Sequence, residues 1–210
     1  MYKIYAQNDS TAEILLYSLI DGGYTASKLI NQLKESPTEE ITLRINSDGG
    51  EIFEAIALYN YLKNKNVHVI VDGICASAAS IVAMSGKTIT MMRGSMMMIH
   101  NPWTIAIGDS EELREQADIL DKLSALTVDI YSTKAKISDK EIMKLMNNDT
   151  WMNAQEALKY GFADEIVIDN DTYSELSEIT GCFQDENGDW VVYDTDERGK
   201  PFNAEKYTSQ

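Results

Sequence analysis

The sequence has 210 residues, enough for one good-sized domain with a short appendage, and its 34 acidic and 18 basic residues give a formal charge of −16. A charge of this sign argues against nucleic acid and against an anionic membrane surface as partners, because both would repel the protein. The two distant cysteines suggest neither a disulfide framework nor a metal cluster, no apolar stretch could span a bilayer, and no basic, apolar leader opens the chain, so we expect a cytoplasmic protein.

Strands and helices are predicted to alternate in the first third of the chain. Apolar residues run together or alternate where we expect strands, and they recur at helical spacing where we expect helices. The expected elements are a strand over residues 12–20, a helix over about 25–35, a strand over 41–46, a helix with an apolar face over 52–62, and a strand over 67–71.

The turn Asn46-Ser47-Asp48-Gly49-Gly50 follows the second of these strands. Paired glycines allow positive φ and can turn bare N–H groups toward a ligand, although an ordinary turn remains the alternative interpretation. Neither of the glycine patterns typical of nucleotide sites is present, so we expect no nucleotide cofactor.

Residues 71–80 carry the candidate nucleophile, because an apolar strand there runs into small residues and then into a helix-like stretch, with Ser77 at the corner. A hydroxyl at such a corner is held clear of the backbone, beside the free N–H groups of the new helix, as acyl transfer requires. Close packing of small residues is the alternative interpretation. Ser80 is a second candidate hydroxyl, but we expect it to lie inside the helix.

A histidine base must be one of only two residues, His68 or His100. We expect strands over 88–92 and 95–99, and His100 follows the second of them beside Pro102, where it can face a cleft. His68 alternates with valines inside a strand, so a sheet-face position is expected for it.

Three further helices are predicted from Asp109, Ser138 and Asn153, because each is followed three residues later by a glutamate, as in a capping box. The first has a broad apolar stripe and is expected to pack on a partner or arm, and the last is expected to end at Gly161. Asp149 lies between the last two helices, where an aspartate is usually a cap or turn residue.

Five segments in order then point to one family. They are Asn46-Ser47-Asp48-Gly49-Gly50, Gly73-Ile74-Cys75-Ala76-Ser77, Met98-Ile99-His100-Asn101-Pro102, the run from Asp149 to Ala157, and Tyr160-Gly161-Phe162-Ala163-Asp164. This ordered set, within residues of about 12–168, resembles the motifs of the Clp protease proteolytic subunit family of serine peptidases, in the crotonase-like superfamily. The resemblance implies an α/β fold, a ClpP/crotonase-like spiral of ββα units, with a protruding helical handle at about 109–136.

The resemblance also implies the roles of individual residues. Ser77 would be the nucleophile, His100 the general base and then acid, and Asp149 the group that orients His100, while Gly50 and Ala78 would supply the N–H groups of an oxyanion hole. This chemistry acts on a polypeptide substrate and needs no cofactor and no metal ion. Family members assemble as homo-oligomers, in heptameric rings or tetradecamers.

Departures from the family pattern bear on the biological role. Asp48 replaces a proline and Cys75 an alanine, neither of which removes a reacting group. The short lead-in, the residues 76–80 and the residues 100–103 resemble the phage and prophage branch, so we expect a head-maturation protease that cuts capsid or scaffold proteins in a bacterial host. The alternatives are an ATP-dependent subunit that works with an AAA+ unfoldase, a crotonase-type acyl-CoA enzyme, and an inactive ring protein used for assembly.

The resemblance ends near residue 168, and the rest is predicted to be an acidic extension. From Asp164 to the C-terminus, 13 acidic and 3 basic residues give a charge of −10. A hairpin about Asn187-Gly188 or partial disorder is expected there. Asp185, Asn187 and Asp189 alternate as in a calcium loop, but Trp190 stands where such a loop has glycine, so a calcium site is not favoured.

Overall fold

The structure, a computed structural model, describes residues 2–6, 11–21, 25–35, 39–167, 182–184 and 190–192, which fall in two compact units, Met1–Val167 and Ile168–Gln210. The first unit contains β1 (Tyr2–Ala6), β2 (Thr11–Leu16), α1 (Thr25–Glu35), β3 (Glu40–Ser47), α2 (Ile52–Leu62), β4 (Asn66–Ala76), α3 (Ala78–Ala83), β5 (Thr88–Met92), β6 (Met96–Ile99), α4 (Ser110–Ser132), α5 (Asp139–Asn147), β7 (Thr150–Asn153), α6 (Ala154–Tyr160) and β8 (Glu165–Val167). The second unit contains β9 (Cys182–Gln184) and β10 (Trp190–Val192).

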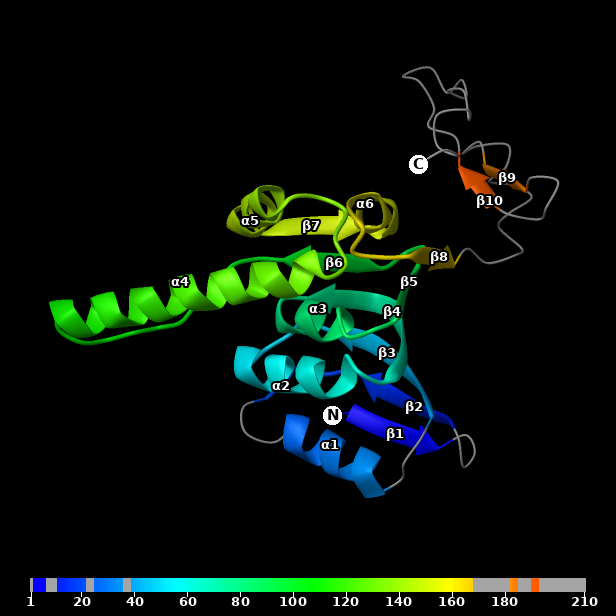
Figure 1. Cartoon of the computed structure of the whole chain (residues 1–210), viewed down its shortest axis with the longest axis horizontal. Coiled ribbons are helices and arrows are strands. Elements are labelled where there is room, and N and C mark those ends of the chain that lie inside the picture. The colour runs from blue at the N-terminus through cyan, green and yellow to red at the C-terminus, as the bar shows by residue number, and fades with distance from the viewer. Residues whose placement is uncertain are drawn as a thin grey trace, which may run out of the picture. The chain divides into compact units, whose positions relative to one another are not determined.

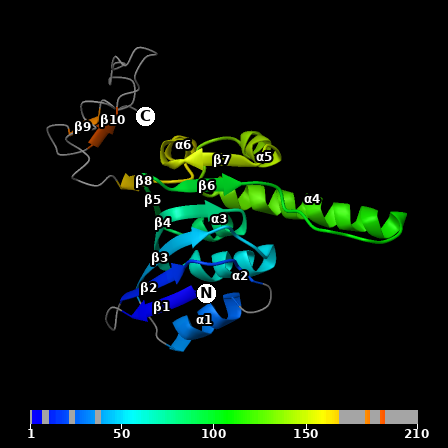
Figure 2. The same cartoon turned by 180° about the vertical axis from the view of Figure 1, so that it is seen from behind.

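The eight strands of the first unit form one sheet in the order β1-β2-β3-β4-β5-β8, with β6 beside β4 and β7 beside β6. The pairs from β2 through β3, β4 and β5 to β8 are parallel, whereas β1 with β2 and β6 with β7 are antiparallel. Helices α1, α2 and α3 lie on the same face of the sheet (Figures 1 and 2). The predicted α/β class and its ββα spiral are confirmed.

Strand β4 changes its partner halfway along its length. Residues 68–71 pair with β5, and residues 74–76 pair with β6. The predicted strand over 67–71 therefore continues through the small residues to Ala76, because β6 supplies a new ladder of hydrogen bonds for its second half. On the other side, the pairing of β3 with β4 shifts in register between Ile45 and Ser47. Both irregularities lie next to the candidate site, beside Ser77 and the glycine turn.

The predicted helix starts at Asp109, Ser138 and Asn153 and the predicted end at Gly161 are confirmed, but the handle helix ends at Ser132 and not at about 136. Each of these helices starts with a capping box. The side chain of the first residue accepts a hydrogen bond from the backbone N–H of the glutamate three residues later, and that glutamate's side chain accepts one from the first residue's own N–H. The first residues are Asp109, Ser138 and Asn153. Gly161 ends α6 at a φ of 83°, in the left-handed region that favours glycine. The strand predicted over 12–20 is shorter, and β1, which pairs with it, was not predicted.

Helix α4 projects from the unit as the predicted handle, and the chain that leads into it runs alongside it (Figures 1 and 2). Its last turns are anchored, since Thr127, Val128, Ile130 and Tyr131 are buried. Farther out, the predicted apolar stripe is exposed at Leu113 and Leu126 and half-buried at Leu120 and Leu123, and Ile119, outside the stripe, is exposed as well. The leading segment also exposes apolar side chains, with Ile107 98% accessible.

In the second unit, β9 and β10 pair antiparallel, with Trp190 opposite Gln184. The expected turn about Asn187-Gly188 and the calcium-like residues Asp185, Asn187 and Asp189 lie outside the described residues. Among the helices that the structure describes, none is both long enough and apolar enough to cross a membrane. In the same part of the chain, no three His, Cys, Asp or Glu side chains are grouped as they would be around a metal ion.

Candidate active site

Ser77 occupies the corner between β4 and α3 in an unusual backbone conformation. Its φ of 55° and ψ of −128° are rare for a residue with a side chain, and such strain is worth about 1–3 kcal/mol. The surrounding bonds hold it there, because the Ser77 N–H donates to the carbonyl of Met98 at 2.9 Å and its own carbonyl accepts from the Ser80 N–H at 2.9 Å. The strand-to-helix corner thus holds the Ser77 hydroxyl clear of the backbone.

His100 meets this hydroxyl because of the strand register. Ala76 pairs with Met98 in the parallel ladder of β4 and β6, so the residues that follow the two strands emerge side by side. The Ser77 Oγ lies 2.7 Å from His100 Nε2, within hydrogen-bonding distance, and only 17% of the histidine side chain is accessible. The arrangement allows a proton to pass from the serine to the imidazole.

Asp149 lies on the other side of His100, again through the register. Ile99 pairs with Thr150 in the antiparallel ladder of β6 and β7. His100, which follows Ile99, therefore faces Asp149, which precedes Thr150. The Asp149 Oδ1 lies 3.8 Å from His100 Nδ1, which is beyond a hydrogen bond, and 76% of the carboxylate side chain is accessible. Asn101 ties the two segments together, donating from Nδ2 to Asn147 Oδ1 at 2.7 Å.

Ser77 and Asp149 share a further property. They are the non-glycine residues with positive φ in the part of the chain that the structure describes. Aspartate enters this region at lower cost than most residues, and the φ of 46° at Asp149 turns the chain out of α5 and into β7. Backbone strain at two adjoining corners is typical of functional sites.

The Gly49-Gly50 turn approaches the serine corner from β3. The φ values of 98° and 138° need glycine, and the turn is pinned to Ile20, which donates to the Gly49 carbonyl and accepts from the Glu51 N–H. Gly49 packs directly on the corner, since a Cβ there would lie 2.8 Å from the Ala78 nitrogen. The Gly50 and Ala78 N–H groups donate no hydrogen bond to any described residue, so both remain available to a ligand.

A cleft of about 750 Å³ lies in front of these groups. Ser77, Ala78, His100 and Gly50 all line it. Its walls are mainly apolar, from residues such as Leu19, Phe53, Ile81, Met98, Trp103 and Leu120. Asp48 and Glu51 are the acidic side chains on its rim. The cleft therefore presents apolar surface beside Ser77 and His100.

The competing candidates lie away from this chemistry. His68 is on the first half of β4, where it bonds Thr88 Oγ1 at 2.8 Å. Ser80 is fully buried inside α3, as expected. Cys75 is also fully buried, and burial raises the pKa of its thiol far above neutrality, so it carries no thiolate to act as a nucleophile.

Sequence reasoning missed two residues that support the site, Ile20 and Tyr131. Ile20 was assigned to a strand, but it forms an isolated bridge with Gly50 instead. Tyr131 was not singled out, although its position next to the apolar Ile130 indicated a buried end of the handle. No local pattern distinguishes a tyrosine whose hydroxyl bonds a buried serine, as Tyr131 bonds Ser80, from one that only fills a core.

Comparison with known proteins adds independent information. A sequence model of the Clp protease family matches residues 1–170. The ATP-dependent Clp protease proteolytic subunit of Streptococcus mutans is 32% identical over 81% of this chain and 91% of its own length. The subunit of that name from Bacteroides fragilis is 31% identical over 74% of this chain and 78% of its own length. The one from Deinococcus radiodurans is 30% identical over 68% of this chain and 74% of its own length.

Proposed function

The chain belongs to the Clp protease family, and from that premise we propose that it is a serine endopeptidase with Ser77 as nucleophile, His100 as general base and Asp149 as orienting carboxylate. The observation that carries this proposal is the 2.7 Å contact between Ser77 Oγ and His100 Nε2. Beside it lie the N–H groups of Gly50 and Ala78, which donate to no described residue. Serine is a weak nucleophile at neutral pH unless an adjacent base takes its proton.

The positions of these atoms support the following reaction. His100 Nε2 accepts the proton as Ser77 Oγ attacks the peptide carbonyl, which requires the ring to carry its own proton on Nδ1, facing Asp149. The imidazolium then gives its proton to the leaving amine, and an acyl-serine remains. Water, activated by the same histidine, releases the acid and restores the serine.

The oxyanion that forms during attack needs donors of its own. We propose that the N–H groups of Gly50 and Ala78 supply them, one from the glycine turn and one from the start of α3. Losing such a donor costs about 3 kcal/mol of transition-state stabilisation in related chemistry. A crotonase-type acyl-CoA reaction would also use an oxyanion hole, but it has no need of the serine–histidine contact.

Asp149→Asn is expected to lower kcat by only about 10-fold, whereas the loss is about 10⁴-fold where a buried aspartate bonds the histidine directly. The physical reason is the 3.8 Å separation and the exposure of Asp149, which weaken its hold on the imidazole. Steady-state peptide hydrolysis measures the effect. A loss as large as that of Ser77→Ala would show that the pair closes during turnover.

A fluorophosphonate probe tests the proposed nucleophile, because it reacts with activated serines and not with ordinary ones. Intact mass should rise by one adduct, and peptide mapping should locate it on Ser77. No adduct on the assembled protein would favour the inactive ring protein instead.

For the biological role, we propose cleavage of capsid or scaffold protein during phage head maturation in the bacterial cytoplasm. The resemblance of residues 76–80 and 100–103 to that branch supports it. The names of the curated relatives favour a second role, an ATP-dependent proteolytic subunit partnered by an AAA+ unfoldase. In either role, the exposed apolar side chains of α4 suit packing between protomers of a ring, heptameric or tetradecameric.

Degradation of a folded, tagged substrate distinguishes the two roles. A head-maturation protease should cut unfolded or scaffold polypeptide at the same rate with and without ATP and a host unfoldase. A Clp subunit should retain the unfoldase in a pull-down and should degrade the folded substrate only when ATP and the unfoldase are present, which would overturn the phage role.

A further inference from the structure

Two buried hydroxyl groups hold the Ser77–Ala78 peptide from behind. Ser80 Oγ lies 2.6 Å from the Ser77 carbonyl oxygen, and the Tyr131 hydroxyl lies 2.7 Å from Ser80 Oγ. Ser80 is 0% and Tyr131 1% accessible, so both groups have exchanged water for these contacts. The three groups form a chain from the base of α4 to the nucleophile.

The direction of the protons in this chain is determined by the carbonyl, which can only accept. Ser80 has a single hydroxyl hydrogen, and it donates that hydrogen to Ser77, so its oxygen must accept from Tyr131. Burial raises the pKa of Tyr131 well above its usual value, and the phenol therefore keeps the proton that it donates. The order is Tyr131 to Ser80 to the Ser77 carbonyl.

The Ser77 carbonyl shares its peptide unit with the Ala78 N–H. The unit is planar and trans, so the N–H points opposite to the carbonyl and cannot turn without it. Fixing the carbonyl therefore aims the N–H at the cleft. Hydrogen bonds to the carbonyl oxygen also polarise the unit, which strengthens the N–H as a donor.

We propose that Ser80 and Tyr131 are positioning residues, which aim and strengthen the Ala78 N–H as an oxyanion donor through the Ser77–Ala78 peptide. This inference rests on the proposed serine peptidase activity. It assigns a function to the Tyr131 hydroxyl, which bonds Ser80 and none of the reacting atoms, although the Tyr131 side chain also lines the cleft.

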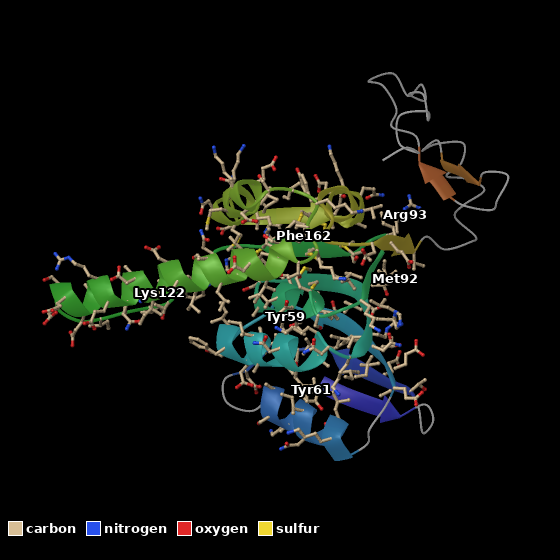
Figure 3. The ribbon with its side chains drawn as sticks, viewed as in Figure 1. Tyr59, Tyr61, Met92, Arg93, Lys122 and Phe162 are labelled. Carbon is tan, nitrogen blue, oxygen red and sulfur yellow. The ribbon has the colours of Figure 1, made fainter. Side chains whose placement is uncertain are left out.

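Packing alone does not account for the tyrosine hydroxyl. The Tyr131 ring meets Phe162 edge-to-face, with centroids 5.5 Å apart, and phenylalanine would fill that space equally well. Phe162 lies in the body of the unit near the base of α4 (Figure 3). Tyr131→Phe should therefore keep the ring contact and remove only the hydrogen bond, which makes it the decisive variant.

The experiment compares Tyr131→Phe and Ser80→Ala with the control Ser85→Ala in the full-length, assembled protein. Ser85 is also a buried hydroxyl just after α3, but its Oγ has no hydrogen-bond partner among the residues that the structure describes. We expect kcat/KM for a fluorogenic peptide to fall about 10-fold to 100-fold in Tyr131→Phe and in Ser80→Ala. This decrease is no larger than the one expected from removing an oxyanion donor altogether. The control should match the native protein.

Inhibition by a peptide aldehyde distinguishes a positioning role from a purely structural one, because a purely structural role would leave the inhibition constant unchanged. The aldehyde forms a tetrahedral oxyanion on Ser77, so its inhibition constant should rise by the same factor as kcat/KM falls. Peptide affinity, measured in the Ser77→Ala background, should stay unchanged because the ground-state carbonyl makes weaker use of the donor.

An unchanged aldehyde inhibition constant in Tyr131→Phe would overturn the inference, whatever happens to Ser80→Ala. So would native kcat/KM in both variants. Failure of the proposed function itself looks different: either the native protein hydrolyses no peptide, or Ser77→Ala retains the native rate of hydrolysis. If Ser80→Ala fails to fold, Tyr131→Phe alone still decides, since it removes one oxygen and keeps the core volume.

Discussion

Ser77→Ala is expected to lower kcat by about 10⁴-fold to 10⁶-fold while the chain still folds and binds peptide. The variant removes the atom that attacks the carbonyl, and no described side chain near His100 can replace it, because Ser80 and Cys75 are fully buried. The proposed oxyanion donors, the N–H groups of Gly50 and Ala78, remain, so a residual rate above that of uncatalysed hydrolysis is expected. Steady-state hydrolysis and labelling by the fluorophosphonate probe both measure the effect.

His100→Ala provides the matched comparison, since it removes the base and leaves the hydroxyl. The two residues act as one unit across a 2.7 Å contact, so the double variant should be no slower than either single variant. The probe adduct should be lost from both. Hydrolysis that survives Ser77→Ala within 10-fold of the native rate would rule out the proposed nucleophile.

Gly50→Ala is expected to lower kcat/KM by more than about 100-fold, the second largest effect, comparable to the loss of a whole oxyanion donor. An added Cβ would lie 2.1 Å from the Ile20 carbonyl oxygen, and the φ of 138° is strained for any residue with a side chain. The turn must therefore move, and the N–H of residue 50 moves with it. Measuring both hydrolysis and thermal unfolding distinguishes a displaced N–H group at residue 50 from a loss of protein stability.

Gly94→Ala is the control for this substitution. In the described part of the chain, no atom lies within 4 Å of a Cβ added at Gly94, and its φ is not in the strained range. The activity of this variant should be native and its stability equal or slightly higher, because alanine restricts the unfolded chain. Equal activity of Gly50→Ala and Gly94→Ala would show that the glycine turn supplies no donor.

Local signals allowed much of the fold to be predicted. The capping boxes at Asp109, Ser138 and Asn153 and the glycine at 161 gave the helix ends, because those signals depend on residues within four positions of one another. The order of the motifs also pointed to Ser77 and His100, whose side chains lie within hydrogen-bonding distance in the structure.

Features set by distant contacts could not be predicted in this way. The change of partner along β4 depends on β6, which is about twenty residues away, and so the strand was predicted to end at 71. The 3.8 Å gap at Asp149 and the hydroxyl chain through Tyr131 depend on how α4, α5 and α3 pack together. Neither leaves a pattern in the sequence, because an aspartate or a tyrosine occurs equally at a purely structural position and at a functional one.

The parallel register of the sheet has a consequence for how the chain becomes active. Ile20 bonds Gly49, and Ser77 bonds Met98, so each half of the corner closes only after some twenty to thirty intervening residues have found their places. Contacts between positions so far apart form slowly, and local helices can be complete before they do. A nascent or partly folded chain therefore carries the serine without the bonds that hold its strained corner, so hydrolytic competence should arise with the last stage of folding and not before.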